Sequence, residues 1–150
     1  MAQQHLKFAI FGNEYQAKKS ASIMRILSYL EKREAEVYIE SLFYDFLTKV
    51  EHLEVQAAGV FEDYNFDVDY VISMGGDGTF LKAASRVGAK GTPILGVNMG
   101  RLGFLADVLP GEIESALDSL YAGECRIEEH AIVEVKAEGG ILAGYPFALN

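Results

Sequence analysis

Short apolar runs alternate with helical patterns along most of this chain, and no other feature limits its possible folds as strongly. The apolar runs fall at 6–12, 36–40, 69–74 and 93–97. Between the first two, apolar residues recur at the i, i+3, i+4, i+7 spacing of an amphipathic helix, over 14–34. Strands that alternate with helices in this way predict an α/β fold, namely a Rossmann-like, mostly parallel sheet with helices on both faces.

Three further segments have helical spacing. Residues 42–53 carry several large aromatic side chains, which we interpret as core residues rather than as a cofactor site. Residues 80–87 follow directly from a glycine-rich segment, and a last helix includes 113–120 and ends near Gly123. Each of these segments would cover part of the sheet.

The pattern changes near the end of the chain. Residues 125–136 alternate in the manner of a strand, 138–140 (Glu-Gly-Gly) resemble a hairpin turn, and 142–149 could be the returning strand. Two successive strands without a helix between them predict two domains. We expect 1–123 to form an α/β nucleotide-phosphate-binding domain and 124–150 to begin a second, all-β domain that is incomplete.

Composition excludes several classes of partner. The chain has 22 acidic residues against 13 Lys and Arg, a net charge of −9, which disfavours nonspecific binding to nucleic acid or to an anionic membrane. No apolar stretch approaches the roughly 20 residues of a membrane helix. With one cysteine there is no intrachain disulfide. We expect a soluble, cytoplasmic protein, and a phosphate ligand remains possible because backbone N–H groups can bind it.

The segment Gly-Gly-Asp-Gly-Thr at 75–79 stands between a predicted buried strand and a predicted helix. The carboxyl ends of parallel strands are where α/β folds bind ligands. Glycines there let the backbone approach a phosphate, the helix start offers unpaired N–H groups, and Thr79 adds a hydroxyl donor. Asp77 has three possible roles: it could hold a divalent metal, accept the proton of an attacking sugar hydroxyl, or only cap the helix.

A second glycine-rich segment, 96–107, follows the next strand and should lie at the same sheet edge. Asn98 offers both a donor and an acceptor to a nucleotide. Leu102 and Phe104 could line an apolar slot for a nucleobase. The alternative is an ordinary glycine-rich turn with Phe104 in the core.

Together the two segments carry a resemblance. The sequence GGDGTFLKAA at 75–84, followed by GVNMGRLGFLAD at 96–107, resembles the NAD kinase family, which phosphorylates the 2′-hydroxyl of the adenosine ribose of NAD. The first element is shared with diacylglycerol and sphingosine kinases, whereas the second is much more specific. The ending ALN at 148–150 is similar to the strand that leads into the family's Asn-Glu motif.

The resemblance implies residue roles. Asp77 would be the catalytic aspartate, acting on the ribose hydroxyl. Lys82 would help to bind the dinucleotide, although a solvated helix lysine is the alternative. The remaining implied contacts are phosphate binding by Gly76, Gly78 and Thr79, an adenine pocket at Leu102 and Phe104, and a ribose or adenine ligand at Asn150.

The resemblance also implies that part of the site is missing, because the family's site lies between this domain and an all-β domain. We expect the full-length parent, a homo-oligomer, to make NADP from NAD with ATP or polyphosphate and Mg²⁺, and this chain alone to be inactive. Two alternatives remain open: the catalytic domain of a lipid kinase, and a nucleotide-binding module without turnover.

Overall fold

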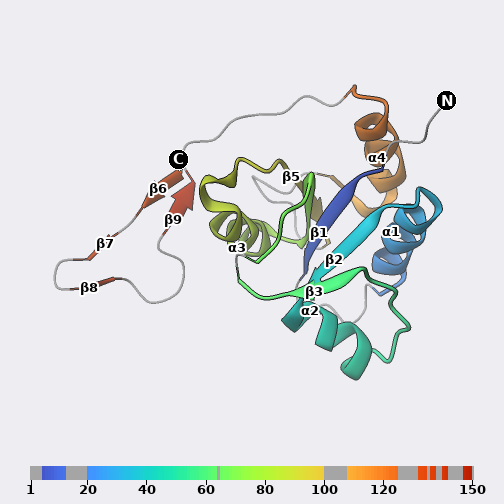
Figure 1. Ribbon diagram of the computed structural model, residues 1–150, viewed down its shortest axis with the longest axis horizontal. Helices are drawn as coiled ribbons and strands as arrows, with labels where there is room; N and C mark the ends of the chain where they lie inside the picture. Colours follow the sequence, from blue (N-terminus) through green and yellow to red (C-terminus); the bar gives the residue numbers. More distant parts are fainter. Residues whose placement is uncertain are drawn as a thin grey trace.

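The computed structural model describes residues 5–12, 20–63, 65–99 and 108–124, together with the backbone of four short strands near the C-terminus (Figure 1). Its centre is a five-stranded sheet in the order β3-β2-β1-β4-β5, in which every neighbouring pair is parallel. The strands are β1 (Lys7–Gly12), β2 (Glu36–Glu40), β3 (Gly59–Phe61), β4 (Tyr70–Gly75) and β5 (Ile94–Asn98). The predicted α/β class with a parallel sheet is confirmed.

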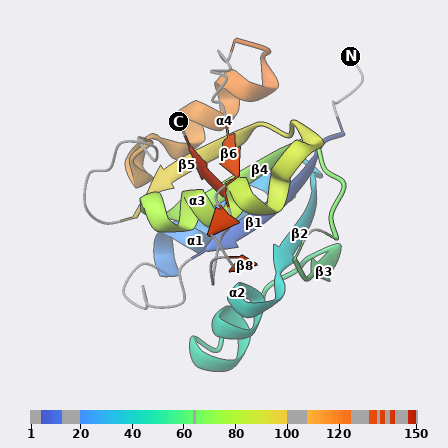
Figure 2. The same ribbon diagram turned by 90° about the vertical axis from the view of Figure 1, so that its left-hand side faces the viewer.

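Helices cover both faces of this sheet, as Figures 1 and 2 show from two directions. The helical elements are α1 (Ser20–Lys32), α2 (Ser41–Asp45), the π-helical turn η2 (Phe46–Val50), α3 (Asp77–Val87), the 3₁₀ turns η3 (Gly88–Lys90) and η4 (Pro110–Glu112), and α4 (Ile113–Tyr121). Helix α3 lies on one face, and α1, α2 and α4 pack into the core on the other. Of the helices in the described ranges, none combines the length and apolarity that a membrane span requires.

The larger core lies between the sheet and α1, α2 and α4. Alternate side chains of the strands, such as Phe8, Ile10 and Ile72, are fully buried there against Leu30 of α1 and Leu117 of α4. Each such side chain contributes about 1.5–3 kcal/mol by leaving water. Because side chains alternate along a strand, Ala9 and Phe11 of β1 point to the opposite face, into the second core.

A smaller core lies under α3 and is largely aromatic. The Phe11 ring of β1 meets the rings of Phe61 and Phe66 edge-on, at centroid distances of 5.3 and 5.9 Å. Ala83 and Val87 of α3 pack on this core. The small Ala83 is fully buried, so α3 can pack closely on the sheet.

Several predicted element boundaries are wrong. The segment at 75–79 is not a loop throughout, since α3 begins at Asp77 and not at residue 80. Gly76, Asp77 and Gly78 have low helix propensities, so the sequence did not indicate the first turn of α3. The predicted helix over 42–53 ends at Val50, where its last turn is π-helical. Strand β3 was not predicted, because three residues at a sheet edge are too few to show a period.

The C-terminal strands pair only in antiparallel fashion. Strand β6 (Ile132–Glu134) pairs with β9 (Phe147–Leu149), and β7 (Lys136–Ala137) pairs with β8 (Gly140–Ile141). The predicted antiparallel pairing of strands around 138–139 is observed in β7 and β8, but Gly140, predicted in the turn, belongs to β8, and residues 138–139 lie outside the described part of the chain. Strand β9 contacts α3, and both figures place the β6–β9 pair beside that helix (Figures 1 and 2).

Candidate functional site

The two glycine-rich segments meet at the edge where the parallel strands end, which we call the carboxyl edge. Gly75, the last residue of β4, is in register with Asn98, the last residue of β5. The Met99 N–H donates to the Gly75 carbonyl at 2.9 Å, and the Asn98 N–H donates to the Val108 carbonyl at 2.7 Å. Asn98 is only 2% exposed. The prediction that these segments lie at one sheet edge is therefore confirmed for residues 75–79 and 96–99, whereas residues 100–107 lie outside the described part of the chain.

Asp77 is the first residue of α3 and lies two residues after Gly75. The N-cap position belongs to Gly76, whose backbone is extended (φ −114°, ψ −159°), and the Gly76 carbonyl accepts the first helical hydrogen bond from Phe80 N at 3.1 Å. The alternative that Asp77 is the N-cap residue is therefore wrong. Its carboxylate is partly exposed and lies in the first helical turn, where the helix dipole favours negative charge.

The three glycines around Asp77 differ in what they contact. A Cβ added to Gly75 would collide with the side chain of Thr79, whose own Cβ would lie 2.8 Å away. A Cβ added to Gly76 or to Gly78 would meet no heavy atom within 4 Å. Packing therefore requires glycine only at Gly75. The space over Gly76 and Gly78 is open, and a ligand could approach the backbone there.

Lys82 is not a solvated helix lysine, so that alternative is wrong. Its Nζ donates to Oε1 of Glu40 at 3.2 Å, and the two side chains are only 19% and 8% exposed. Oε2 of the same carboxylate accepts from the Phe43 N–H at 3.3 Å, at the start of α2. Glu40 ends β2, so this ion pair also lies at the carboxyl edge.

Sequence reasoning missed Glu40. The available signal was its position, because a glutamate that ends a predicted buried strand should lie at the ligand-binding edge. No motif contains it, and its partner is 42 residues away. Leu102, Phe104 and Asn150 lie outside the described residues, and their implied roles stay predictions.

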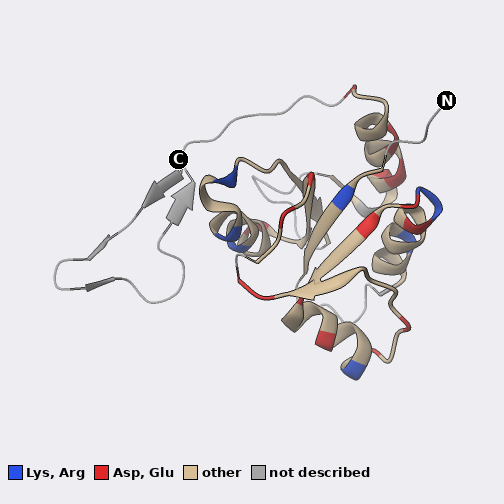
Figure 3. Cartoon of the chain, viewed as in Figure 1, with Lys and Arg blue, Asp and Glu red and all other residues tan. Residues whose placement is uncertain are grey.

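Among the residues that the structure describes, charge is not concentrated in one region of the fold. Figure 3 shows Lys and Arg on several elements, among them β1, α1 and α3, with Asp and Glu between them. Near the start of α3, the described groups that could bind a phosphate are backbone N–H groups and Lys82.

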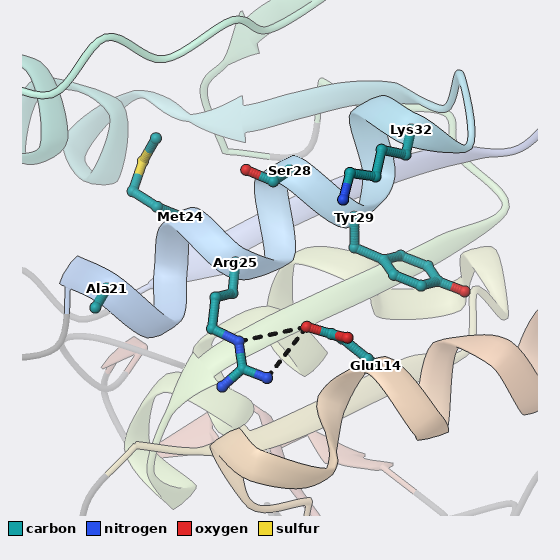
Figure 4. A pocket seen from close by; sticks show the side chains of 7 residues that line it. All are labelled: Ala21, Met24, Arg25, Ser28, Tyr29, Lys32 and Glu114. Atoms are coloured by element: carbon teal, nitrogen blue, oxygen red, sulfur yellow. Dashed lines mark hydrogen bonds and ion pairs between the residues drawn. The ribbon is translucent and has the colours of Figure 1, made fainter.

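A shallow groove of about 290 Å³ lies between α1 and α4, across the sheet from α3 (Figure 4). Inside it, Arg25 donates through Nε and Nη2 to Oε1 of Glu114, at 3.3 and 3.1 Å. At its edge, the Tyr29 hydroxyl donates to Asp118. Burial, and then this hydrogen bond, raise the pKa of Tyr29 to about 12, and the same hydrogen bond lowers the pKa of Asp118. These groups join α4 to α1 on the face of the sheet opposite α3.

Known proteins resemble this chain in sequence. Residues 8–125 match the family model of the ATP-NAD kinase N-terminal domain. The NAD kinase of Bacteroides fragilis is 50% identical over 145 residues, covering 97% of this chain and 50% of that protein. The NAD kinase of Porphyromonas gingivalis is 40% identical over 144 residues, covering 96% and 49%. This chain thus spans about half the length of the curated relatives that it matches.

The fold also has a solved counterpart. A crystal structure of yeast NADH kinase complexed with NADH aligns with a TM-score of 0.70 over 85% of this chain and 41% of that chain, at 16% sequence identity. At this identity the likeness concerns the fold alone.

Proposed function

This chain belongs to the NAD kinase family, and we propose from that premise that it supplies the phosphate-binding half of an enzyme that converts NAD to NADP. One observation carries the proposal. Asp77 lies in the first turn of α3 at the carboxyl edge, between two glycines that the packing does not require and beside the segment that begins at Asn98. A carboxylate there could reach a ribose whose phosphates lie on the helix start.

The proposed reaction is a phosphoryl transfer to the 2′-hydroxyl of the adenosine ribose. Asp77 accepts a hydrogen bond from that hydroxyl and then its proton. The ribose oxygen forms a bond to the terminal phosphorus of ATP or polyphosphate, and the bond from that phosphorus to its bridging oxygen breaks. The N–H groups at the start of α3 bind phosphate oxygens and hold the ribose in line, and Lys82 adds a further contact to phosphate that strengthens binding.

Mg²⁺ is expected to arrive with the phosphates of the donor. No three His, Cys, Asp or Glu side chains gather as a metal site among the described residues, whereas Asp77 offers one carboxylate at the loop. That arrangement fits a metal carried mainly by phosphate oxygens, which is common for Mg²⁺. The ion would neutralise phosphate charge during transfer.

The whole enzyme, as we propose it, also has an all-β domain that begins near residue 124, forms a homo-oligomer in the cytoplasm, and places Leu102, Phe104 and Asn150 around the adenosine. We expect the 150-residue chain alone to be inactive. Family membership leaves the lipid-kinase alternative without support. A nucleotide-binding module without turnover is the remaining alternative.

A chimera tests the proposal directly. Residues 1–150 are joined to the remaining half of the Bacteroides fragilis enzyme, and NADP formation from NAD and ATP is followed with a coupled dehydrogenase. We expect turnover by the chimera and none by the 150-residue chain. The intact Bacteroides fragilis enzyme is the positive control. A chimera that is folded, binds NAD and makes no NADP would support the non-catalytic alternative.

Substituting Gly78→Ala should stabilise the fold while weakening dinucleotide binding. Gly78 is helical and has space for a methyl group, so alanine should add about 0.5–1 kcal/mol to the free energy of unfolding. The same methyl group would occupy the proposed phosphate position, and a clash of about 1.4 kcal/mol weakens binding roughly tenfold.

Urea unfolding and isothermal titration of the chimera with NAD measure the two effects of Gly78→Ala. Gly111→Ala is the control, because its added methyl group also meets no atom but lies in η4. Unchanged NAD affinity in Gly78→Ala would show that no phosphate lies over this glycine.

A further inference from the structure

We propose that Glu40 is a positioning residue: its buried carboxylate holds the ammonium group of Lys82 where that group meets a phosphate of the bound dinucleotide. This inference rests on the proposed function and adds to it a residue that no motif contains. Its basis is that the two carboxylate oxygens of Glu40 have different partners: Oε2 accepts from the Phe43 N–H, and Oε1 accepts from Lys82 Nζ.

Glu40 faces the side of the sheet that α3 covers. Side chains alternate along β2, and Val37 and Ile39 belong to the larger core on the side of α1. Tyr38 packs into the smaller core under α3, and Glu40 faces the same side. Its carboxylate is therefore directed toward α3 at the point where β2 ends.

The side chain of Glu40 is buried. Glu40 is 6% exposed, and a carboxylate removed from water to that degree requires hydrogen-bonding partners. The Phe43 N–H donates to Oε2, which ties the carboxylate to the backbone at the start of α2. Oε1 is left for Lys82 Nζ, 3.2 Å away. The backbone thus fixes the carboxylate, and the carboxylate in turn fixes the ammonium group.

The ion pair with Glu40 places the ammonium group of Lys82 at the carboxyl edge. Strand β1 lies between β2 and β4, so the ion pair reaches across the end of β1 from α3 to β2. An ammonium group has three donors and Oε1 takes one of them, which leaves donors for a phosphate. Because the long side chain is ordered before the ligand arrives, binding does not have to immobilise it. A lysine without Glu40 would lose that advantage.

A purely structural role is the competing explanation, since the same pair ties α3 to β2. The two explanations differ in how two substitutions combine. If Glu40 acts through Lys82, its removal has no further effect on dinucleotide binding once Lys82 is gone. If the pair only supports the fold, substituting Lys82 or Glu40 changes the free energy of unfolding and leaves the KM for NAD unchanged.

The experiment uses the chimera with Lys82→Met, Glu40→Gln and both together. Glutamine keeps an oxygen for the Phe43 N–H and removes the charge. We expect Lys82→Met to raise the KM for NAD roughly tenfold, Glu40→Gln to raise it about threefold, and kcat to change less than about twofold in each. The double variant should match Lys82→Met alone.

Arg86→Met is the matched control, because Arg86 is another cation of α3 and pairs at 3.7 Å with the exposed Asp63. It should leave the KM for NAD unchanged. Urea midpoints measured for all variants separate loss of fold from loss of binding. Normal KM values in both single variants, or KM effects that multiply in the double variant, would overturn the positioning role. Turnover by the unsubstituted chimera tests the proposed function separately.

Discussion

Asp77→Asn should lower NADP formation by the chimera at least about a hundredfold, because asparagine cannot accept the proton of the ribose hydroxyl. The substitution keeps the size of the side chain at the first position of α3. The fold should be almost unaffected, since a carboxylate in the first turn of a helix contributes about 0.3–1 kcal/mol through the helix dipole. The measurements are kcat by the coupled assay and the urea midpoint of the same preparation.

Asp45→Asn is the control for this prediction. Asp45 is an exposed acid of α2, paired with Lys49 at 3.5 Å within the same segment, and its loss should leave kcat unchanged. A kcat for Asp77→Asn within a few fold of the unsubstituted chimera would remove Asp77 from the chemistry. It would leave only a favourable charge at the start of a helix.

Gly12→Ala should lower the free energy of unfolding by about 1–3 kcal/mol, the usual cost of forcing a methyl group into a packed core. Gly12 ends β1, and a Cβ built there falls on the ring of Phe43, which is itself 1% exposed. That ring packs near the ring of Phe46 and has little room to move. Urea unfolding of the 150-residue chain, followed by circular dichroism, measures the loss.

Two further variants test whether the ring of Phe43 causes the loss of stability in Gly12→Ala. Gly111→Ala should have little effect, because its added methyl group meets no atom. Phe43→Leu makes room for the new methyl group, so Gly12→Ala should cost less in that background than alone. Equal costs in both backgrounds would mean that the ring of Phe43 is not what requires glycine at the end of β1.

Much of the candidate site could be predicted because it follows from chain direction. In a parallel sheet all strands end at one edge, so a residue placed just after a strand by the sequence is placed at that edge in space. Asp77 and Asn98 come at or just after two strands that prove to be neighbours, and their segments meet as predicted. The apolar patterns similarly located four of the five strands of the parallel sheet and the buried helix faces.

Other features of the site could not be predicted, because they depend on side-chain positions that only the folded chain defines. The partnership of Lys82 with Glu40 joins residues 42 positions apart and depends on which strands lie side by side. The difference between Gly75 and Gly78 depends on where the side chain of Thr79 lies. The start of α3 at Asp77 overrides local preferences that favour a loop.

The sequence by itself therefore determined the fold class and the edge of the sheet where the chemistry should lie, because periodicity and chain direction are local properties. The family was indicated separately, by the resemblance that the two motifs carry. Only the tertiary structure decided which glycines the packing requires and how Lys82 is held. Those properties depend on side chains from separate elements that meet in a small volume. Close packing there allows each side chain one arrangement.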